Sequence, residues 1–377
     1  MKFFLLTVVA ISCAATSRGE APWEYSSAQL RPFWVGDTVE GESILFIKDP
    51  ETGSATGSLL FPVKSVVSVR NSAGTTTYEE GRDYRWNPDS REIELPKGSR
   101  IVAVTPSQLR RPAGSQRHRL THRDGSGEIL FGAKLEYHTL QTVVSYTHDP
   151  GLWKSPVPDF EETSLPRSIG KLREAKPLSI VVLGDSISTG CNASGWAEGE
   201  PHQPAYPQLL ARHLEEVYES KITLTNLSIG GKRSAWGITM AEAVATAKPD
   251  LVIVAFGMND SAGVPAADYK ANTAAIIAKT RELVPEAEFV LVASMLGNRD
   301  WTVLKHESFV PFRDVLEELS EPGVALADMT SIWSEFLTLK KDWDLTGNGV
   351  NHPNDFGHRV YAQVISSLLV APGPSEN

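Results

Sequence analysis

The stretch Leu178-Ser179-Ile180-Val181-Val182-Leu183-Gly184-Asp185-Ser186-Ile187-Ser188-Thr189-Gly190 decides the fold of this chain. Its first six residues are almost continuously apolar and include three β-branched side chains, which is typical of a strand buried on both faces of a parallel sheet. Gly184 permits a tight turn, and Asp185 suits the start of a helix. The stretch therefore predicts that the Ser186 hydroxyl lies at the carboxyl edge of a parallel sheet, where open α/β folds bind their ligands.

The same rhythm of strand, loop and helix continues to the C-terminus. Further strands are predicted at 221–227, 250–256, 289–293 and 324–327, and helices at 206–218, 234–247, 266–283 and from 354 onward. Repeated βα units imply a parallel sheet covered by helices on both faces, with right-handed connections that bring all strand carboxyl ends to one edge. We therefore predict a doubly wound α/β domain over residues 178–377.

The first half of the chain has a different pattern. Short runs rich in β-forming residues, separated by turn residues, are predicted as strands at 43–47, 58–63, 65–69, 91–95, 100–104, 128–131 and 142–146. No helical periodicity interrupts them, so we expect a β-sandwich or jelly-roll domain over residues 21–150. Residues 151–177 contain four prolines and scattered charges, which is the composition of a linker.

The N-terminus predicts export. Lys2 is followed by a short apolar run and by small residues near Ala14, as in a signal peptide over residues 1–20, so we expect a secreted or periplasmic protein. The alternative is a lipoprotein signal with Cys13 as the lipidated residue. The apolar run is too short for a stable membrane span. The net charge of -10 argues against nucleic acid as the main partner, and the oligomeric state stays open.

Polar residues with complementary chemistry follow the later strands. Gly231 comes after the second predicted strand, Asn259 after the third, and His352 before the last helix. With Ser186 they supply a nucleophile, a base, and donors for a developing oxyanion, which is what acyl transfer needs. No cluster has metal-ligand spacing and no glycine-rich phosphate loop is present, so we expect no metal and no cofactor.

These four residues, in this order, resemble the four blocks of the SGNH (GDSL-type) hydrolase superfamily. The resemblance covers residues 178–369 and implies a flavodoxin-like sheet. It also implies that Ser186 is the nucleophile and His352 the general base, and that the oxyanion hole consists of the Ser186 and Gly231 backbone amides with the Asn259 side chain. The two-domain layout resembles carbohydrate acetylesterases that carry an N-terminal β-module.

One departure from the family pattern concerns the group that orients the histidine. The last block usually reads Asp-x-x-His, but Gly349 stands three residues before His352. Asn348 or Asp344 could approach the imidazole instead, or Asp355 one turn along the helix. A backbone carbonyl holding the ring, which leaves a Ser-His dyad, is the other alternative, because the third group mainly fixes tautomer and orientation.

The leading hypothesis from the sequence is an exported serine esterase that removes short acyl groups, acetyl foremost, from carbohydrate through an acyl-enzyme. Trp196, Trp236 and Trp301 follow strand ends, where they either stack on sugars or pack under loops. The alternatives are a lipase or thioesterase acting on longer acyl chains and a non-catalytic glycan-binding protein. A basic run from Arg110 to Arg123 is read as a solvated loop or as a contact for an anionic polymer.

Overall fold

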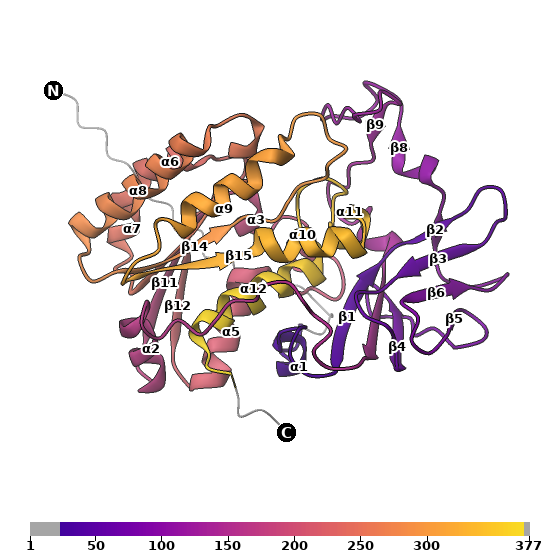
Figure 1. Ribbon diagram of the computed structural model, residues 1–377, viewed down its shortest axis with the longest axis horizontal. Helices are drawn as coiled ribbons and strands as arrows, with labels where there is room; N and C mark the ends of the chain where they lie inside the picture. Colours follow the sequence, from indigo (N-terminus) through magenta and orange to yellow (C-terminus); the bar gives the residue numbers. More distant parts are fainter. Residues whose placement is uncertain (1–22, 373–377) are drawn as a thin grey trace.

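The computed structural model describes residues 23–372 and places a parallel α/β domain beside a β-rich module (Figure 1). The predicted signal peptide lies outside the described residues. Within the described range, no helix is both long and apolar enough to cross a membrane.

The central sheet of the α/β domain has five parallel strands, in the order β12-β11-β13-β14-β15. The strands are β11 (Leu178–Gly184), β12 (Ile222–Asn226), β13 (Leu251–Ala255), β14 (Glu288–Ala293) and β15 (Val324–Asp328). Since β11 comes first in the chain, the order reverses between β11 and β13, and the sheet has the flavodoxin-like arrangement. The predicted fold class of this domain is confirmed.

Side chains alternate between the two faces of the sheet. Ile180 and Val182 enter one hydrophobic core, and Val181 and Leu183 enter the other. The first core contains α2 (Pro166–Arg173), α5 (Tyr206–Tyr218), α10 (Met329–Leu339) and α12 (Asp355–Leu369), and the second contains α7 (Ala241–Thr246), α8 (Ala266–Leu283) and part of α9 (Phe309–Glu317). Helices therefore cover both faces, as predicted from the βα rhythm.

Two parts of this domain differ from the sequence prediction. The helix expected over 234–247 is divided into α6 (Ser234–Gly237), a 3-10 turn η3 (Ile238–Met240) and α7. A Cβ at Gly237 would lie 2.7 Å from Ile276 and 2.8 Å from Phe256, so α6 approaches α8 more closely than a continuous helix with larger side chains could. Helices α9 and α10 were not predicted.

The β-module contains three small sheets. The first has the order β1-β10-β4, the second β5-β6-β3-β2-β7, and the third pairs β8 with β9. Their strands are β1 (Thr38–Ile44), β2 (Phe46–Lys48), β3 (Ala55–Ser58), β4 (Ser65–Asn71), β5 (Arg85–Trp86), β6 (Glu92–Leu95), β7 (Ala103–Val104), β8 (Arg110–Arg111), β9 (Glu128–Ile129) and β10 (Thr142–Thr147). The β-rich character is confirmed, and the jelly-roll connectivity stays a prediction.

The run 58–63 is not the strand that we expected. The chain leaves β3 at Ser58, and two of the next backbone N–H groups bond to buried side chains instead of backbone carbonyls. The Leu60 N–H donates to the Glu42 carboxylate, and the Phe61 N–H donates to the Tyr146 hydroxyl. Buried polar partners have replaced the ladder that the apolar pattern suggested.

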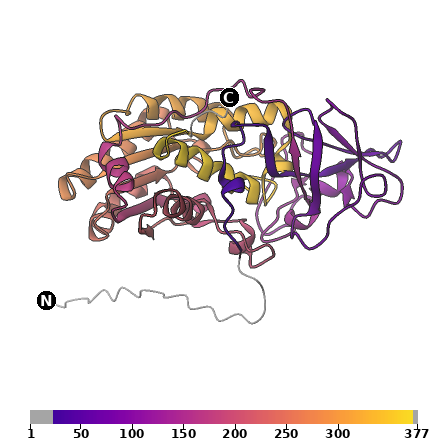
Figure 2. The ribbon, with the colours of Figure 1, turned by 90° about the horizontal axis from the view of Figure 1, so that it is seen from below.

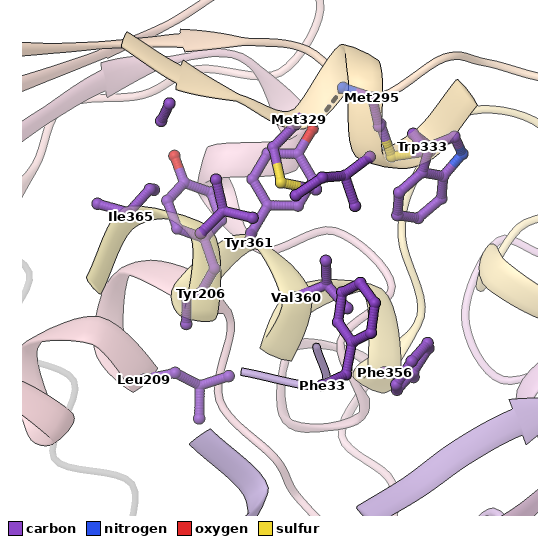
Figure 3. Close-up of a cluster of buried hydrophobic side chains, with 14 of the residues drawn as sticks. Phe33, Tyr206, Leu209, Met295, Met329, Trp333, Phe356, Val360, Tyr361 and Ile365 are labelled. Atoms are coloured by element: carbon purple, nitrogen blue, oxygen red, sulfur yellow. Dashed lines mark hydrogen bonds between the residues drawn. The ribbon is translucent and has the colours of Figure 1, made fainter. Parts of the chain in front are cut away.

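The β-module and the α/β domain share one hydrophobic core. Residues 151–177, expected as a linker, include α2, whose Ile169 and Leu172 are buried in that core. Phe33, from the N-terminal part of the chain, lies against α12 near Phe356 and Val360 (Figure 3). On the same helix, the Tyr361 hydroxyl accepts a hydrogen bond from the Met295 N–H. Figure 2 shows the same side-by-side arrangement of the two parts from below.

A buried ion pair also joins the two parts. Lys340, just after α10, pairs with Glu42 of β1, and both side chains are fully buried. Glu42 also accepts hydrogen bonds from the Tyr146 hydroxyl and the Leu60 N–H, and the Lys340 ammonium donates to the Ser58 carbonyl. The carboxylate and the ammonium therefore have their charges and hydrogen bonds satisfied by one another and by their neighbours.

Removing one member of this pair should destabilise the protein strongly. Lys340→Met leaves the Glu42 carboxylate buried without its cation, which costs about 3–5 kcal/mol of unfolding free energy. We expect a clearly lower urea midpoint for Lys340→Met. The double variant Glu42→Gln, Lys340→Met should recover much of the loss, because no unpaired charge remains. A single variant as stable as the double variant would contradict this account.

Candidate active site

The four residues singled out from the sequence lie on loops at the carboxyl edge of the parallel sheet. Ser186 is the first residue of α3 (Ser186–Thr189), directly after β11. Gly231 follows β12, Asn259 follows β13, and His352 precedes α12. Because β11 and β13 flank the point at which the strand order reverses, their following loops diverge and leave this edge available to a ligand.

The turn that carries Ser186 depends on Gly184 and Asp185. A Cβ on Gly184 would lie 2.6 Å from the Ala255 carbonyl oxygen and 2.4 Å from Ser188 Oγ, so only glycine fits between β11, β13 and α3. Asp185 is the N-cap residue of α3, and its side chain accepts a hydrogen bond from the Ile187 N–H. The expected capping role of Asp185 is therefore confirmed.

Ser186 and His352 are in direct contact. Ser186 Oγ lies 2.9 Å from His352 Nε2, and His352 Nδ1 lies 2.8 Å from Asn192 Oδ1. Ser186 is buried, with 8% of its surface exposed, whereas His352 is partly exposed. The three side chains form a hydrogen-bonded row in the order that a nucleophile, a base and an orienting group require.

The orientation of the Asn192 amide is determined by its other contacts. Its Nδ2 donates to the carbonyl oxygens of Gly132 at 3.1 Å, Lys134 at 3.2 Å and Gly347 at 3.2 Å. Since carbonyls only accept, Nδ2 must face them and Oδ1 must face the imidazole. Oδ1 also only accepts, so His352 carries its proton on Nδ1. The neutral ring then presents the Nε2 lone pair to the Ser186 hydroxyl, which donates to it.

The backbone conformation at position 192 is one reason why an asparagine suits this position. Its φ is 67°, in the left-handed region where asparagine is among the few non-glycine residues commonly found. A Cβ at Gly347 would lie 2.7 Å from the Asn192 Cβ, so the loop before His352 approaches this residue closely.

The residues expected to orient His352 lie elsewhere or bond elsewhere. Asn348 Oδ1 accepts the backbone N–H groups of Val350, Asn351 and His352, so its side chain shapes the loop and does not reach the ring nitrogen. Asp344 accepts from the Leu45 and Lys341 N–H groups, and Asp355 from the Ser194 N–H. The structure therefore places Asn192 at the position for which we expected Asn348, Asp344, Asp355 or a backbone carbonyl.

The expected oxyanion donors are partly engaged. The Ser186 and Gly231 N–H groups have no hydrogen-bond acceptor among the described residues, and Gly231, at φ 77°, is exposed and has no heavy atom within 4 Å of a built Cβ. Asn259 Nδ2 instead donates to Asp185 Oδ2 at 3.2 Å and to the Lys232 carbonyl at 3.0 Å. The Asn259 amide thus ties the Gly231–Lys232 turn to Asp185, and its part in an oxyanion hole remains a proposal.

Burial controls the protonation of the central groups. Burial, with the nearby His358 as a second cause, lowers the pKa of His352 to about 3. Burial raises the pKa of Asp185 to about 7, and the neighbouring Asp260 acts in the same direction. At neutral pH His352 is therefore unprotonated and able to accept the proton of Ser186.

Two further observations concern possible binding sites for a ligand or a metal ion. A cavity of about 520 Å³ lies between residues 156–164 and β15, and none of the candidate catalytic residues lines it. In the described part of the chain, no group of three or more His, Cys, Asp and Glu side chains is arranged to hold a metal ion.

Residues 182–360 match the GDSL-like Lipase/Acylhydrolase family. This segment is a GDSL-type hydrolase domain. It includes Ser186, Gly231, Asn259 and His352, the four residues on which the resemblance to the SGNH superfamily was based. No curated protein matches the chain.

Among solved structures, the chain is similar to a two-domain esterase (CEX) active on acetylated mannans, at 22% identity and a TM-score of 0.45, over 55% of this chain and 52% of that chain. It thus spans about half the length of that esterase. It is also similar to a variant of Axe2, an acetyl xylan esterase from Geobacillus stearothermophilus, at 20% identity and a TM-score of 0.42, over 52% of this chain and 97% of that chain.

Within this GDSL-type domain, Asn192 is the residue that the sequence analysis missed. It lies six residues after Ser186, in Gly190-Cys191-Asn192, and 160 residues before His352. The spacing pattern around His352 therefore holds no signal for it. The usable signal was an asparagine soon after the nucleophile, on a loop that begins at the same sheet edge.

Asn192→Ala should lower kcat by about a hundredfold or more, with little change in KM. The ring loses the acceptor for its Nδ1–H, so the productive tautomer and orientation are no longer enforced. Ester hydrolysis by the variant and the wild type, normalised to folded protein by circular dichroism, measures the effect. Asn348→Ala is the comparison variant, and we expect a smaller loss in kcat from it, because the Asn348 side chain bonds to backbone N–H groups of its own loop and to Asn351 rather than to the imidazole ring.

Asn192→Asp is the control that separates orientation from charge. A carboxylate keeps an acceptor for His352, but its second oxygen would face the three carbonyls that now receive Nδ2 hydrogens. We therefore expect lower thermal stability than wild type and no gain in kcat. Wild-type stability with higher kcat in this variant would show that the three carbonyl contacts do not define the amide.

The pH profile should show the base active in mild acid. Because the pKa of His352 is lowered, the neutral base persists as pH falls below 6.5, and protonation removes activity only as pH approaches the lowered value. We expect kcat/KM to change by no more than about twofold between pH 7 and pH 5. Circular dichroism at each pH separates titration from unfolding. An acid limb centred near pH 6.5 in folded protein would contradict the lowered pKa.

Proposed function

We propose that this protein is an exported serine esterase that removes short acyl groups, acetyl foremost, from carbohydrate. The observation that carries the proposal is the hydrogen-bonded row Ser186–His352–Asn192 at the strand-order reversal of a GDSL-type domain. The export part is supported by the signal-like sequence of residues 1–20.

The proposed reaction uses this row twice. Ser186 Oγ attacks the ester carbonyl carbon while its proton passes to His352 Nε2, and the oxygen of the tetrahedral intermediate faces the Ser186 and Gly231 N–H groups. His352 then donates that proton to the departing alcohol oxygen as the ester bond breaks, leaving an acyl-enzyme. In the second half, His352 takes a proton from water and the resulting nucleophile attacks the acyl carbon. The bond between Ser186 Oγ and that carbon then breaks, the carboxylic acid leaves, and Ser186 Oγ takes the proton back from His352.

A short acyl group is supported by the surroundings of the nucleophile. Ile229, Gly230 and Gly231, in the turn that follows β12, are exposed, with Ile229 at 47%. This side of the site is therefore open to solvent and is not part of a buried apolar channel that would enclose a long chain. Burial of such a chain would be needed to gain binding free energy from its methylene groups.

A carbohydrate substrate is supported by Trp196. Its side chain is 39% exposed, in the short helix α4 (Ser194–Ala197) that follows Asn192, and the Lys134 ammonium lies 5.1 Å from the ring centroid. Trp236 and Trp301, by contrast, are partly buried against hydrophobic clusters. Only Trp196 of these three thus presents a large exposed aromatic face, the kind of surface on which a sugar ring can stack.

The esterase proposal is tested with p-nitrophenyl esters of increasing acyl length. We expect wild-type protein to release p-nitrophenol from the acetate, and Ser186→Ala to abolish the release because the nucleophile is gone. Ser188→Ala is the matched control. It removes a nearby hydroxyl that bonds to Tyr206 and not to His352, so most activity should remain.

The other functions predict different outcomes of this experiment. Rates that rise steadily from acetate to octanoate would favour a lipase or thioesterase. Folded protein with no turnover of any ester would favour the non-catalytic glycan-binding alternative and would refute the esterase proposal. Acetate release from a panel of acetylated polysaccharides then tests the carbohydrate part.

A further inference from the structure

The segment 110–134, here called the cationic loop, carries a charge opposite to that of the protein. It contains five arginines and one lysine against two acidic residues, an excess of four positive charges in a chain of net charge -10. The rest of the chain is therefore at -14. Such a local reversal of charge calls for an explanation beyond solubility.

The cationic loop packs directly on the residues that precede His352. Leu120 and Ile129 form one buried cluster with Val350, and Phe131 and Trp301 pack against that cluster. The Gly132 N–H donates to the Asn348 carbonyl, and the Gly132 and Lys134 carbonyls hold the Asn192 amide. In Figure 1, β8 and β9 belong to the part of the β-module that faces the carboxyl ends of the parallel strands. The positive charge is thus adjacent to the candidate active site.

The acidic side chains of this region are already engaged. Asp124 lies within ion-pair distance of Arg110 and His122, and Asp300 within ion-pair distance of His122. Glu128 is buried and accepts from the Gly114 N–H and the Gln116 amide. These carboxylates are therefore not available to neutralise the other arginines.

The positive charge of several guanidinium groups is consequently not balanced by a neighbouring carboxylate. Among the described residues, Arg111, Arg117, Arg119 and Arg123 form no ion pair with a carboxylate, and Arg117, Arg119 and Arg123 are exposed. Arg123 is used structurally, because it donates to the Arg299, Trp301 and Leu304 carbonyls. Within residues 23–372, Arg117 and Arg119 make no such anchoring contacts, and the side-chain hydrogen bond of this pair runs from Arg119 to Thr121.

We propose that the cationic loop binds the carboxylate or sulfate groups of an anionic polysaccharide whose acyl groups are removed at Ser186. This inference rests on the proposed esterase function and names its substrate class. Guanidinium groups bind carboxylate and sulfate oxygens bidentately, and a repeating anionic chain can engage several of them beside the scissile ester. A nucleic acid carries phosphate esters but no acyl groups for Ser186 to remove, so the position of the cationic loop beside the candidate active site favours an acylated polysaccharide.

The test compares Arg117→Glu, Arg119→Glu with a control pair, Arg85→Glu, Lys97→Glu. Both pairs are exposed and change the net charge equally, but the control pair lies on or beside β5 and β6, in a different sheet of the β-module. The substrates are acetylated polygalacturonate, uronate-free acetylated xylan and p-nitrophenyl acetate.

For acetylated polygalacturonate at low salt, we expect the loop variant to raise KM about tenfold with kcat nearly unchanged. KM for the two uncharged substrates, and all values for the control pair, should stay within about twofold of wild type. Because salt screens exposed charges, 0.5 M NaCl should remove the difference. Competition by polygalacturonate against dextran sulfate then distinguishes a carboxylate from a sulfate ligand.

Equal KM changes for anionic and uncharged substrates, or equal effects of the two variant pairs, would overturn the proposal. If no ester is hydrolysed by wild type, the proposed function fails, and affinity electrophoresis in polygalacturonate still tests the loop. Retardation of wild type and the control pair but not the loop variant would support it. No retardation of wild type in either polygalacturonate or dextran sulfate, or tighter binding of an RNA oligomer, would refute it.

Discussion

The amide of Asn192 is the interaction on which the candidate site depends. A primary amide has one end that donates and one that accepts, and the three carbonyls around Nδ2 leave only one orientation for it. That orientation decides the tautomer of His352, and the tautomer decides whether Ser186 has a proton acceptor. Two of the three carbonyls, from Gly132 and Lys134, belong to the β-module. The β-module therefore contributes to the candidate site, and contacts that hold the two parts together, such as the Glu42–Lys340 ion pair, help to keep those carbonyls in place.

In the α/β domain, the strand order determines which residues meet at the candidate site. Ser186 and Asn259 follow β11 and β13, the two strands at the reversal, and Asp185 is bonded to both of their loops. Close packing of Gly184 against the Ala255 carbonyl permits these strand ends to meet at that point. The resulting site is made of short loops held by a rigid sheet, which is the condition for keeping donors and nucleophile within hydrogen-bond distance of one reacting atom.

The features that could be predicted from the sequence share a local cause. Each of these features depends on residues that are consecutive in the sequence: the apolar strands, the glycine turn at Gly184 and the polar residues at strand ends. The parallel topology then brings those strand ends together. Asn192 could not be found in this way, because its contact with His352 spans 160 residues and requires the β-module to supply carbonyls. The prediction of a strand over 58–63 was wrong for a similar reason, since Glu42 and Tyr146, which lie elsewhere in the sequence, satisfy two of its N–H groups. Helix α10 was not predicted because it begins at Met329, directly after β15 ends at Asp328, so no turn or loop residues separate the two elements in the sequence.

The side chain that orients His352, Asn192, is neutral, and this affects the energetics of the proposed reaction. In the proposed reaction, an asparagine carbonyl would stabilise the imidazolium less than a carboxylate, so His352 would be a weaker base and would gain less by accepting the proton of Ser186. The stabilisation of the transition state would then depend more on the proposed oxyanion donors. Buried negative charge close to those donors would oppose it, and Asp185 and Asp260 are buried carboxyls of this region. Burial raises the pKa of both, that of Asp185 to about 7. Burial around the Ser186 turn thus disfavours the charged form of His352 and of both carboxyls, which is the direction that the proposed attack on a neutral ester requires.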